Sequence, residues 1–466
     1  KVTISQQIVT KNRKVIFFMI EKLNANASLS DLITAFENST NEIKTISNTL
    51  KQTLINKNIK VLDTDKLSSL VDKVDKLKAQ EFGVRINKLD ENPDTCVSYL
   101  GDAIGMTPAS VGSYGSWDTI DFIRNIKPCG FKDGIVTKYI KKENFNMYED
   151  GTNVEDDTDV MIEFPKFYWK IQSSDNYMDI FISKTKLDDD YECPAHLIGS
   201  TEKEFIYIGA YLAYLENSKL RSKKNVSPTI ASYSSFKSIS TKYLGYDILD
   251  HQCMLMLQIL FIIIFKSIDC KKLGIGYGSY IGGHYKSNGI NTGGSSFKGM
   301  LYGEQNGDEQ IKFLGVEDLW GNYQQITSRC TATSQNGCVC IEVTKRDGKR
   351  ILSSIGRKVG VVTDVLGGTN TGFLVKNMIE NAGGEPQDTR YYKCWASLDE
   401  RMPRHYVGFN YSENSRYYGL FSSFFQSDHT ASTRLIFIGE DNQNTLKTIQ
   451  EDELLFVENE KVGGIL

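Results

Sequence analysis

The chain has 466 residues, of which 40% are hydrophobic and 11% aromatic, and a net charge of −4. Its length predicts about three structural units rather than one small module, and its aromatic content excludes a disordered chain. With 54 basic against 58 acidic residues, the chain lacks the excess positive charge that attracts phosphate backbones, so we expect no nucleic-acid partner.

The first 80 residues combine an apolar segment with a heptad pattern. Residues 2–20 predict a strand, and their apolar run is too short for a secretory signal. Residues 29–80, interrupted at 56–65, predict a helical, coiled-coil-like region that joins subunits. Because two of its eight seam positions are polar, a helical hairpin within one subunit stays open as the alternative. The seam positions are Leu29, Phe36, Ile43 and Leu50, and Leu32, Ser39, Ile46 and Thr53.

From residue 82 onward, short alternating segments separated by turn residues predict β structure. Residues 160–169 predict one long strand bent by a bulge at Pro165. The polar stretch that ends at residue 241 predicts a loop. Residues 247–268 predict a central helix, whose apolar run is too short to span a membrane. Together with strands predicted near the C-terminus, these elements indicate an α+β fold. The later strands are predicted at residues 338–343, 358–365, 405–411 and 433–438.

The sequence contains several groups that invite a metal or cofactor assignment, and none has the required spacing. The glycine-rich residues 274–307 follow a helix and lack the lysine of a phosphate-binding loop. The five histidines form no zinc-binding pair, and the nine cysteines are scattered, so we expect reduced thiols. Cys338 and Cys340 predict buried thiols, and the acidic residues 149–159 predict a solvated turn rather than a calcium loop. We therefore expect no metal and no cofactor.

Aromatic residues are concentrated in residues 391–425, where eleven occur among 35 positions. Serine, asparagine and arginine lie between them, a mixture typical of binding surfaces. The alternative is that half of these rings belong to the domain core. We predict that the receptor-binding residues are Tyr411, Asn414, Arg416, Tyr417, Tyr418 and Phe424.

Three segments carry a resemblance to known families. FGVRINKLDENPDTCVSYLGDAIGMTPA at residues 82–109 and DVMIEFPKFYWK at residues 159–170 resemble receptor-binding tail proteins of phages and phage-tail-like bacteriocins of clostridial-type, Gram-positive bacteria. GVEDLWGNYQQI at residues 315–326 is similar to the signature of the formylglycine-generating-enzyme type of C-type-lectin fold. The structural residues of this motif are Asp318, Trp320, Gly321 and Asn322, and Arg434 matches the final strand of that fold.

The resemblance implies an adhesion protein rather than an enzyme. The oxidases of the fold family use two closely spaced cysteines before the final strand, whereas residues 421–434 contain none and Cys394 stands alone upstream. The calcium-binding lectin branch needs a Glu-Pro-Asn or Gln-Pro-Asp turn, whereas this chain has Gln387 after Glu385 and Pro386. We therefore expect no catalytic residues. A polysaccharide hydrolase of the tail and, less favoured, a formylglycine-type oxidase remain as alternatives.

The resemblance also implies a domain order and partners. An attachment segment at residues 1–28 and the oligomerisation region would contact the baseplate, a C-type-lectin-like domain at residues 82–440 would bind the bacterial surface, and residues 441–466 would form a tail. The expected assembly is a homotrimer on a virion or tailocin baseplate, made in the bacterial cytoplasm. Its receptor would be a surface-layer protein or a cell-wall glycan, and no membrane span is expected.

Overall fold

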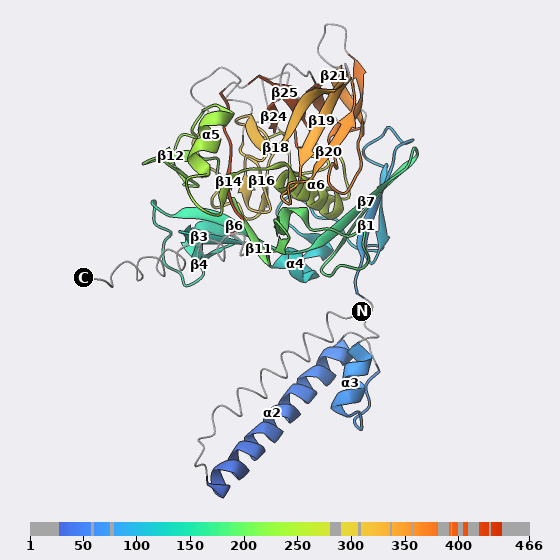
Figure 1. Ribbon diagram of the computed structural model, residues 1–466, viewed down its shortest axis with the longest axis vertical. Coiled ribbons are helices and arrows are strands. Elements are labelled where there is room, and N and C mark those ends of the chain that lie inside the picture. Colours follow the sequence, from blue (N-terminus) through green and yellow to red (C-terminus); the bar gives the residue numbers. More distant parts are fainter. Residues whose placement is uncertain are drawn as a thin grey trace, which may run out of the picture. The chain divides into compact units, whose positions relative to one another are not determined.

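The computed structural model divides the chain into two compact units, residues 1–79 and 80–466 (Figure 1). The strand predicted at residues 2–20 and the predicted C-terminal tail lie outside the described residues. The described residues are 28–56, 60–74, 79–279, 290–305, 309–335, 338–356, 358–380, 391–392, 394–398, 404–408, 419–427 and 430–439.

The described residues of the first unit form two helices, α2 (Leu29–Asn56) and α3 (Leu67–Val74). A reciprocal cap starts α2, because the Ser28 hydroxyl accepts from the Asp31 amide at 3.2 Å and the Asp31 carboxylate accepts from the Ser28 amide at 2.9 Å. The helices contact each other, and Leu54 and Leu70 are fully buried. The predicted interruption between the helices is therefore present, and α3 packs against α2 as a hairpin would.

The apolar heptad positions of α2, called the heptad stripe below, are largely exposed to solvent. Leu29 and Phe36 are each 74% exposed and Ile43 is 54% exposed. The polar seam residues Ser39 and Thr53 donate their hydroxyl hydrogens to carbonyls of their own helix, at 2.7 and 2.9 Å. The single chain therefore buries only part of the predicted seam, and no coiled coil forms within the described residues.

The second unit is rich in β structure and contains a few helices, so the α+β class is confirmed at this coarse level. Its described strands form sheets of four, seven and eight strands and three smaller ribbons (Figure 1). The four-stranded sheet has the order β2-β1-β8-β7. Its strands are β1 (Phe82–Asn87), β2 (Val97–Gly101), β7 (Tyr168–Ser173) and β8 (Tyr177–Ser183).

The seven-stranded sheet, with the order β14-β26-β11-β6-β3-β4-β5, joins strands from widely separated parts of the chain. The last strand of the described residues, β26, pairs with both β11 and β14. This pairing closes the fold. The strands are β3 (Lys127–Lys132), β4 (Ile135–Lys141), β5 (Asn144–Tyr148), β6 (Asp159–Pro165), β11 (Phe205–Gly209), β14 (Tyr246–Ile248) and β26 (Leu435–Phe437).

The eight-stranded sheet has the order β20-β19-β18-β24-β25-β23-β21-β22, in which only the β23–β25 pair is parallel among the described strands. The strands predicted at residues 338–343 and 358–365 belong to it, and so does the part of the strand predicted at residues 405–411 that ends at Val407. The strands are β18 (Gln325–Gln335), β19 (Cys338–Thr344), β20 (Arg350–Ser354), β21 (Lys358–Val365), β22 (Val375–Glu380), β23 (Trp395–Leu398), β24 (Arg404–Val407) and β25 (Ser423–Gln426).

Shorter elements connect the sheets. They are β9 (Leu197–Ile198), β10 (Thr201–Glu202), β12 (Tyr214–Glu216), β13 (Lys219–Arg221), β15 (Leu301–Tyr302), β16 (Lys312–Phe313), β17 (Val316–Glu317), the helices α4 (Asp121–Arg124) and α5 (Tyr233–Ser240), and the 3-10 turns η1 (Gly115–Thr119) and η2 (Pro194–His196).

Two expectations from sequence were wrong. The single bent strand expected across residues 160–169 is two strands, β6 and β7, which belong to different sheets. Pro165 ends β6, because a proline has no amide hydrogen to continue the ladder. The polar stretch expected to be a loop contains the β12–β13 hairpin and helix α5, which Ser232 caps by accepting from the Ser235 amide.

Helix α6 (His251–Phe265) forms the centre of the unit, as expected from its apolar sequence. Every residue of α6 is buried, and the helix contacts β18, β1 and η2. Asp250 caps its first turn by accepting from the Cys253 amide at 2.9 Å. The same carboxylate accepts from the Arg346 guanidinium at 2.8 Å, and both side chains are buried. One aspartate therefore starts the central helix and neutralises a buried arginine of the β19–β20 turn.

We predict that Asp250→Asn, which retains a capping oxygen but removes the charge, lowers the free energy of unfolding by about 3 to 5 kcal/mol, because Arg346 stays buried without a counter-charge. The matched control is Asp121→Asn, which breaks the exposed Asp121–Arg124 pair and should cost less than about 1 kcal/mol. Urea denaturation measures both. Equal, small losses in the two variants would contradict the central role of the Asp250 charge.

Candidate functional site

The residues of the GVEDLWGN motif lie in the core of the second unit. Trp320 is fully buried, and its indole nitrogen donates to the Gly276 carbonyl at 2.9 Å. Its ring meets the Phe261 ring of α6 edge to face, with centroids 6.1 Å apart. The tryptophan therefore attaches the segment after β17 to the central helix and to the glycine-rich region.

Gly321 and Asn322 make the turn that follows Trp320. Both have positive φ, 80° and 56°, and a Cβ on Gly321 would lie 2.9 Å from the Gly278 backbone. The Asn322 side chain accepts from the Ile290 amide and donates to the Ile290 carbonyl, each at 3.1 Å. The turn therefore contacts the glycine-rich region at two points, residues 278 and 290.

Arg434 is the most deeply embedded charge of this motif. Its guanidinium is fully buried and donates to the carbonyls of Gly209, Ala210, Glu317 and Asp318 and to the Gln325 side chain. These acceptors lie at the end of β11, around β17 and at the start of β18. A single side chain next to the last described strand thus connects three segments, each of which lies more than 100 residues before it in the chain.

The buried charges around Arg434 are balanced. Burial lowers the pKa of Lys312 to about 7 and that of Arg434 to about 10. Burial and the neighbouring Glu317 charge raise the pKa of Asp318. Glu317 accepts hydrogen bonds from Gly293, Ser295 and Gln310. The motif residues therefore make their contacts in the protein interior. They are Asp318, Trp320, Gly321, Asn322 and Arg434.

The predicted receptor-binding residues fall in a part of the chain that is largely undescribed. Tyr411, Asn414, Arg416, Tyr417 and Tyr418 lie outside the described residues. Phe424, in β25, is only 4% exposed and packs in the core, so we remove it from the predicted receptor face. Other described aromatic side chains of this region are also buried, as the core alternative expected. They are Tyr392, Tyr406, Phe421 and Phe425.

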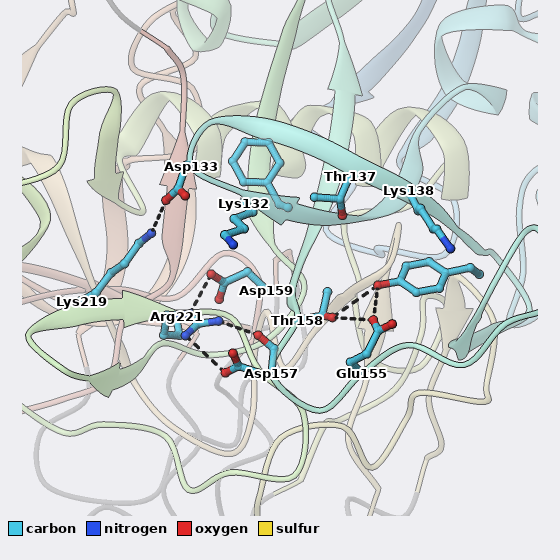
Figure 2. A pocket seen from close by; sticks show the side chains of 12 residues that line it. Lys132, Asp133, Thr137, Lys138, Glu155, Asp157, Thr158, Asp159, Lys219 and Arg221 are labelled. Atoms are coloured by element: carbon cyan, nitrogen blue, oxygen red, sulfur yellow. Dashed lines mark hydrogen bonds and ion pairs between the residues drawn. The ribbon is translucent and has the colours of Figure 1, made fainter.

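An open cleft of about 440 Å³ lies next to β3, β4 and β13 (Figure 2). Sequence reasoning missed it. The only sequence signal was the acidic turn at residues 149–159, whose basic partners come from distant segments. The lining residues are Phe131, Lys132, Asp133, Thr137, Lys138, Tyr148, Glu155, Asp157, Thr158, Asp159, Lys219 and Arg221.

Ion pairs organise the floor and one wall of the cleft. Arg221 donates to the Asp159 carboxylate at 2.8 Å, and the second Asp159 oxygen accepts from the Ser222 amide at 2.8 Å. Burial raises the pKa of Asp159, while the Arg221 charge acts in the opposite direction. Lys219 pairs with Asp133 at 3.1 Å. These contacts connect β13 to β6 and to the turn between β3 and β4.

On the other wall, the Tyr148 hydroxyl donates to the Glu155 carboxylate at 2.8 Å (Figure 2). Lys138 pairs with Asp150, outside the cleft lining, at 2.9 Å. Lys132 is exposed and, within the described part of the chain, makes no ion pair or side-chain hydrogen bond. Its ammonium is therefore available to a ligand.

The structure brings together two cysteines that the sequence separates by more than 120 residues. Cys270 and Cys394 are fully buried, and a Cβ at Gly419 would lie 2.6 and 3.4 Å from their sulfurs. Burial opposes ionisation of Cys394, but the Cys270 contact and the Lys271 charge lower its pKa overall. Cys394 is therefore not isolated, contrary to the expectation from sequence. No group of three or more metal-ligating side chains occurs among the described residues.

Three buried histidines are held in the neutral form. Burial lowers the pKa of His405 to about 3, of His251 to about 4 and of His196 to about 3. The His405 ring lies between the Thr327 hydroxyl at 2.7 Å and the Ser423 hydroxyl at 3.0 Å. These contacts connect β18, β24 and β25.

Comparisons with known proteins add no relative. Neither a scan against protein families nor a search of curated proteins finds a match to this chain. In the described residues no helix is both long and apolar enough to cross a membrane.

We predict that Trp320→Ala lowers the free energy of unfolding by about 3 to 5 kcal/mol, because it leaves a large cavity against α6. Phe297→Ala is the control, since Phe297 is 61% exposed, and it should cost less than about 0.5 kcal/mol. Thermal and urea melts measure the two. A Trp320→Ala protein with unchanged melting would show that the ring does not support the core.

We also predict that acid destabilises the protein through its histidines. Between about pH 6.5, the unfolded value, and the lowered folded values, the unfolded chain binds more protons, so the free energy of unfolding falls as the pH falls. At pH 5 each neutral histidine should account for about 2 kcal/mol. His405→Gln should therefore reduce the difference in unfolding free energy between pH 7.5 and pH 5 by this amount. An unchanged difference would show that His405 is protonated in the folded state.

Proposed function

We propose that this protein is the receptor-binding protein of a phage or tailocin baseplate, with a C-type-lectin-like domain, and that it acts by adhesion. The observation that carries the proposal is the division of the chain into a helical unit with an exposed heptad stripe and a large β-rich unit. Apolar heptad positions that stay exposed in one chain are expected to be buried by other copies of the same helix.

Oligomerisation gives the adhesion mechanism its strength. A homotrimer attached to the baseplate through the N-terminal region would present three copies of the second unit to the bacterial surface. Linked copies gain about 10² to 10⁴ in avidity when their geometry permits simultaneous contact. Weak binding by each copy is then sufficient for attachment to a surface-layer protein or a cell-wall glycan.

The second unit is suited to carry binding loops. Its motif residues are buried and tie distant strands together through Arg434 and Trp320. A scaffold fixed from within tolerates sequence change in its surface loops. We retain Tyr411, Asn414, Arg416, Tyr417 and Tyr418 as the proposed receptor face.

The direct experiment is adsorption. Labelled full-length protein should bind intact clostridial-type cells, and purified cell walls incubated with it should release no sugar. Sugar release would instead support the polysaccharide hydrolase. One observation argues against a hydrolase. Asp159 is the most buried carboxylate of the cleft, and both of its oxygens already accept hydrogen bonds.

A formylglycine-type oxidase is a second candidate because Cys270 and Cys394 lie together and the pKa of Cys394 is lowered. Both thiols are fully buried, which leaves them inaccessible to a peptide in this conformation. Incubation with a cysteine-containing peptide, followed by an aldehyde probe, tests this candidate. We expect no aldehyde, and its appearance would replace the adhesion proposal.

We predict that Ile43→Asp converts the trimer to a monomer, because the charge falls in the apolar seam of α2. The matched control is Asn48→Asp, at an exposed position outside the seam of the same helix, which should leave the trimer intact. Light scattering gives the mass of each. Removal of residues 1–80 should likewise give a folded monomer, and a truncated protein that is still trimeric would assign assembly to the second unit.

A further inference from the structure

We infer that the cleft beside β3 and β13 binds a saccharide unit that carries a single anionic group, a carboxylate or a phosphate. The inference deepens the proposed function, on which it rests, by naming the chemistry of one receptor component. The lining residues come from β3, β4, β5, β13, the β3–β4 turn and the acidic turn, and residues 411–418 are not among them.

The charge of the ligand follows from the pairing inside the cleft. Four basic and four acidic side chains line it, and the acidic ones are already engaged. Asp133 pairs with Lys219, Asp159 and Asp157 contact Arg221, and Glu155 accepts from Tyr148. The remaining cation without a partner in the described residues is Lys132. One anionic group satisfies that ammonium, whereas a polyphosphate would meet four carboxylates.

The hydrogen-bonding groups of the cleft suit hydroxyl-bearing ligands. The Thr137 hydroxyl is exposed and makes no hydrogen bond with a described residue. Asp157 is 81% exposed, and only its Oδ1 atom pairs with Arg221 and Lys223, so Oδ2 can accept from a sugar hydroxyl. A sugar ring offers hydroxyls that both donate and accept, which matches a site with a hydroxyl and a carboxylate oxygen.

The size and aromatic content of the cleft limit the ligand further. A volume of about 440 Å³ lies in the range of small-molecule sites, about 300 to 1,000 Å³. Phe131 and Tyr148 are only 3% and 4% exposed, and the Phe131 ring packs on the Tyr207 ring with centroids 4.6 Å apart. Neither ring offers a free face on which a nucleobase could stack.

The test uses glucuronate and glucose 6-phosphate as anionic probes and glucose as the neutral one. In NMR titrations of the full-length protein, at least one anionic probe should bind ten times or more tightly than glucose. Lys132→Gln should weaken that binding at least tenfold, whereas Lys242→Gln, which removes an exposed lysine outside the cleft, should leave it unchanged. Preference for glucuronate would identify an acidic sugar, and preference for glucose 6-phosphate would identify a phosphorylated glycan.

Equal binding of charged and neutral probes, or unchanged binding by Lys132→Gln, would overturn the inference. Adsorption to cells separates this failure from failure of the proposed function. In one outcome, cells adsorb the parent and Lys132→Gln proteins equally, with no competition by either anionic probe. This result would support adhesion as the function and show that the cleft plays no part in it. Anionic probe binding that requires Lys132, in a protein that adsorbs to no cell, would support the cleft site and count against adhesion.

Discussion

The guanidinium of Arg434 is the contact on which the second unit depends. It reaches carbonyls at the end of β11 and around β17 and the side chain of Gln325 at the start of β18. A buried arginine is costly unless its donors are satisfied, so these segments are held where they can accept. Strand β26 follows Arg434 and pairs with both β11 and β14. The C-terminal part of the described fold is therefore bonded to segments that come much earlier in the chain.

A second buried charge acts at the start of the central helix. Asp250 caps α6 and neutralises Arg346, so the start of the central helix contacts the β19–β20 turn. Trp320 packs on the same helix through Phe261. Apolar packing supplies most of the stability of such a core, whereas the two buried arginines connect segments that pack around it. The surface is then free to carry a polar cleft without loss of order.

The cleft and the helical stripe illustrate two different kinds of surface. In the cleft nearly every charge has a partner within the unit, which leaves Lys132 as a specific point of contact. On α2 the exposed groups are apolar and repeat every seven residues, so their partner is expected to be another helix. The first surface suits a small polar ligand, and the second suits assembly.

Local sequence determined helices α2, α3 and α6, several strands and the coarse fold class. The apolar run of α6, the heptads of α2 and the alternation in β19 and β21 each carry their own periodicity, which depends on near neighbours alone. Tertiary structure decided the rest. The break between β6 and β7, the contact of Cys270 with Cys394 and the cleft that joins Lys132 to Arg221 all depend on which strands pair and in what register. Such pairings bring together residues far apart in the chain, and no local pattern encodes them.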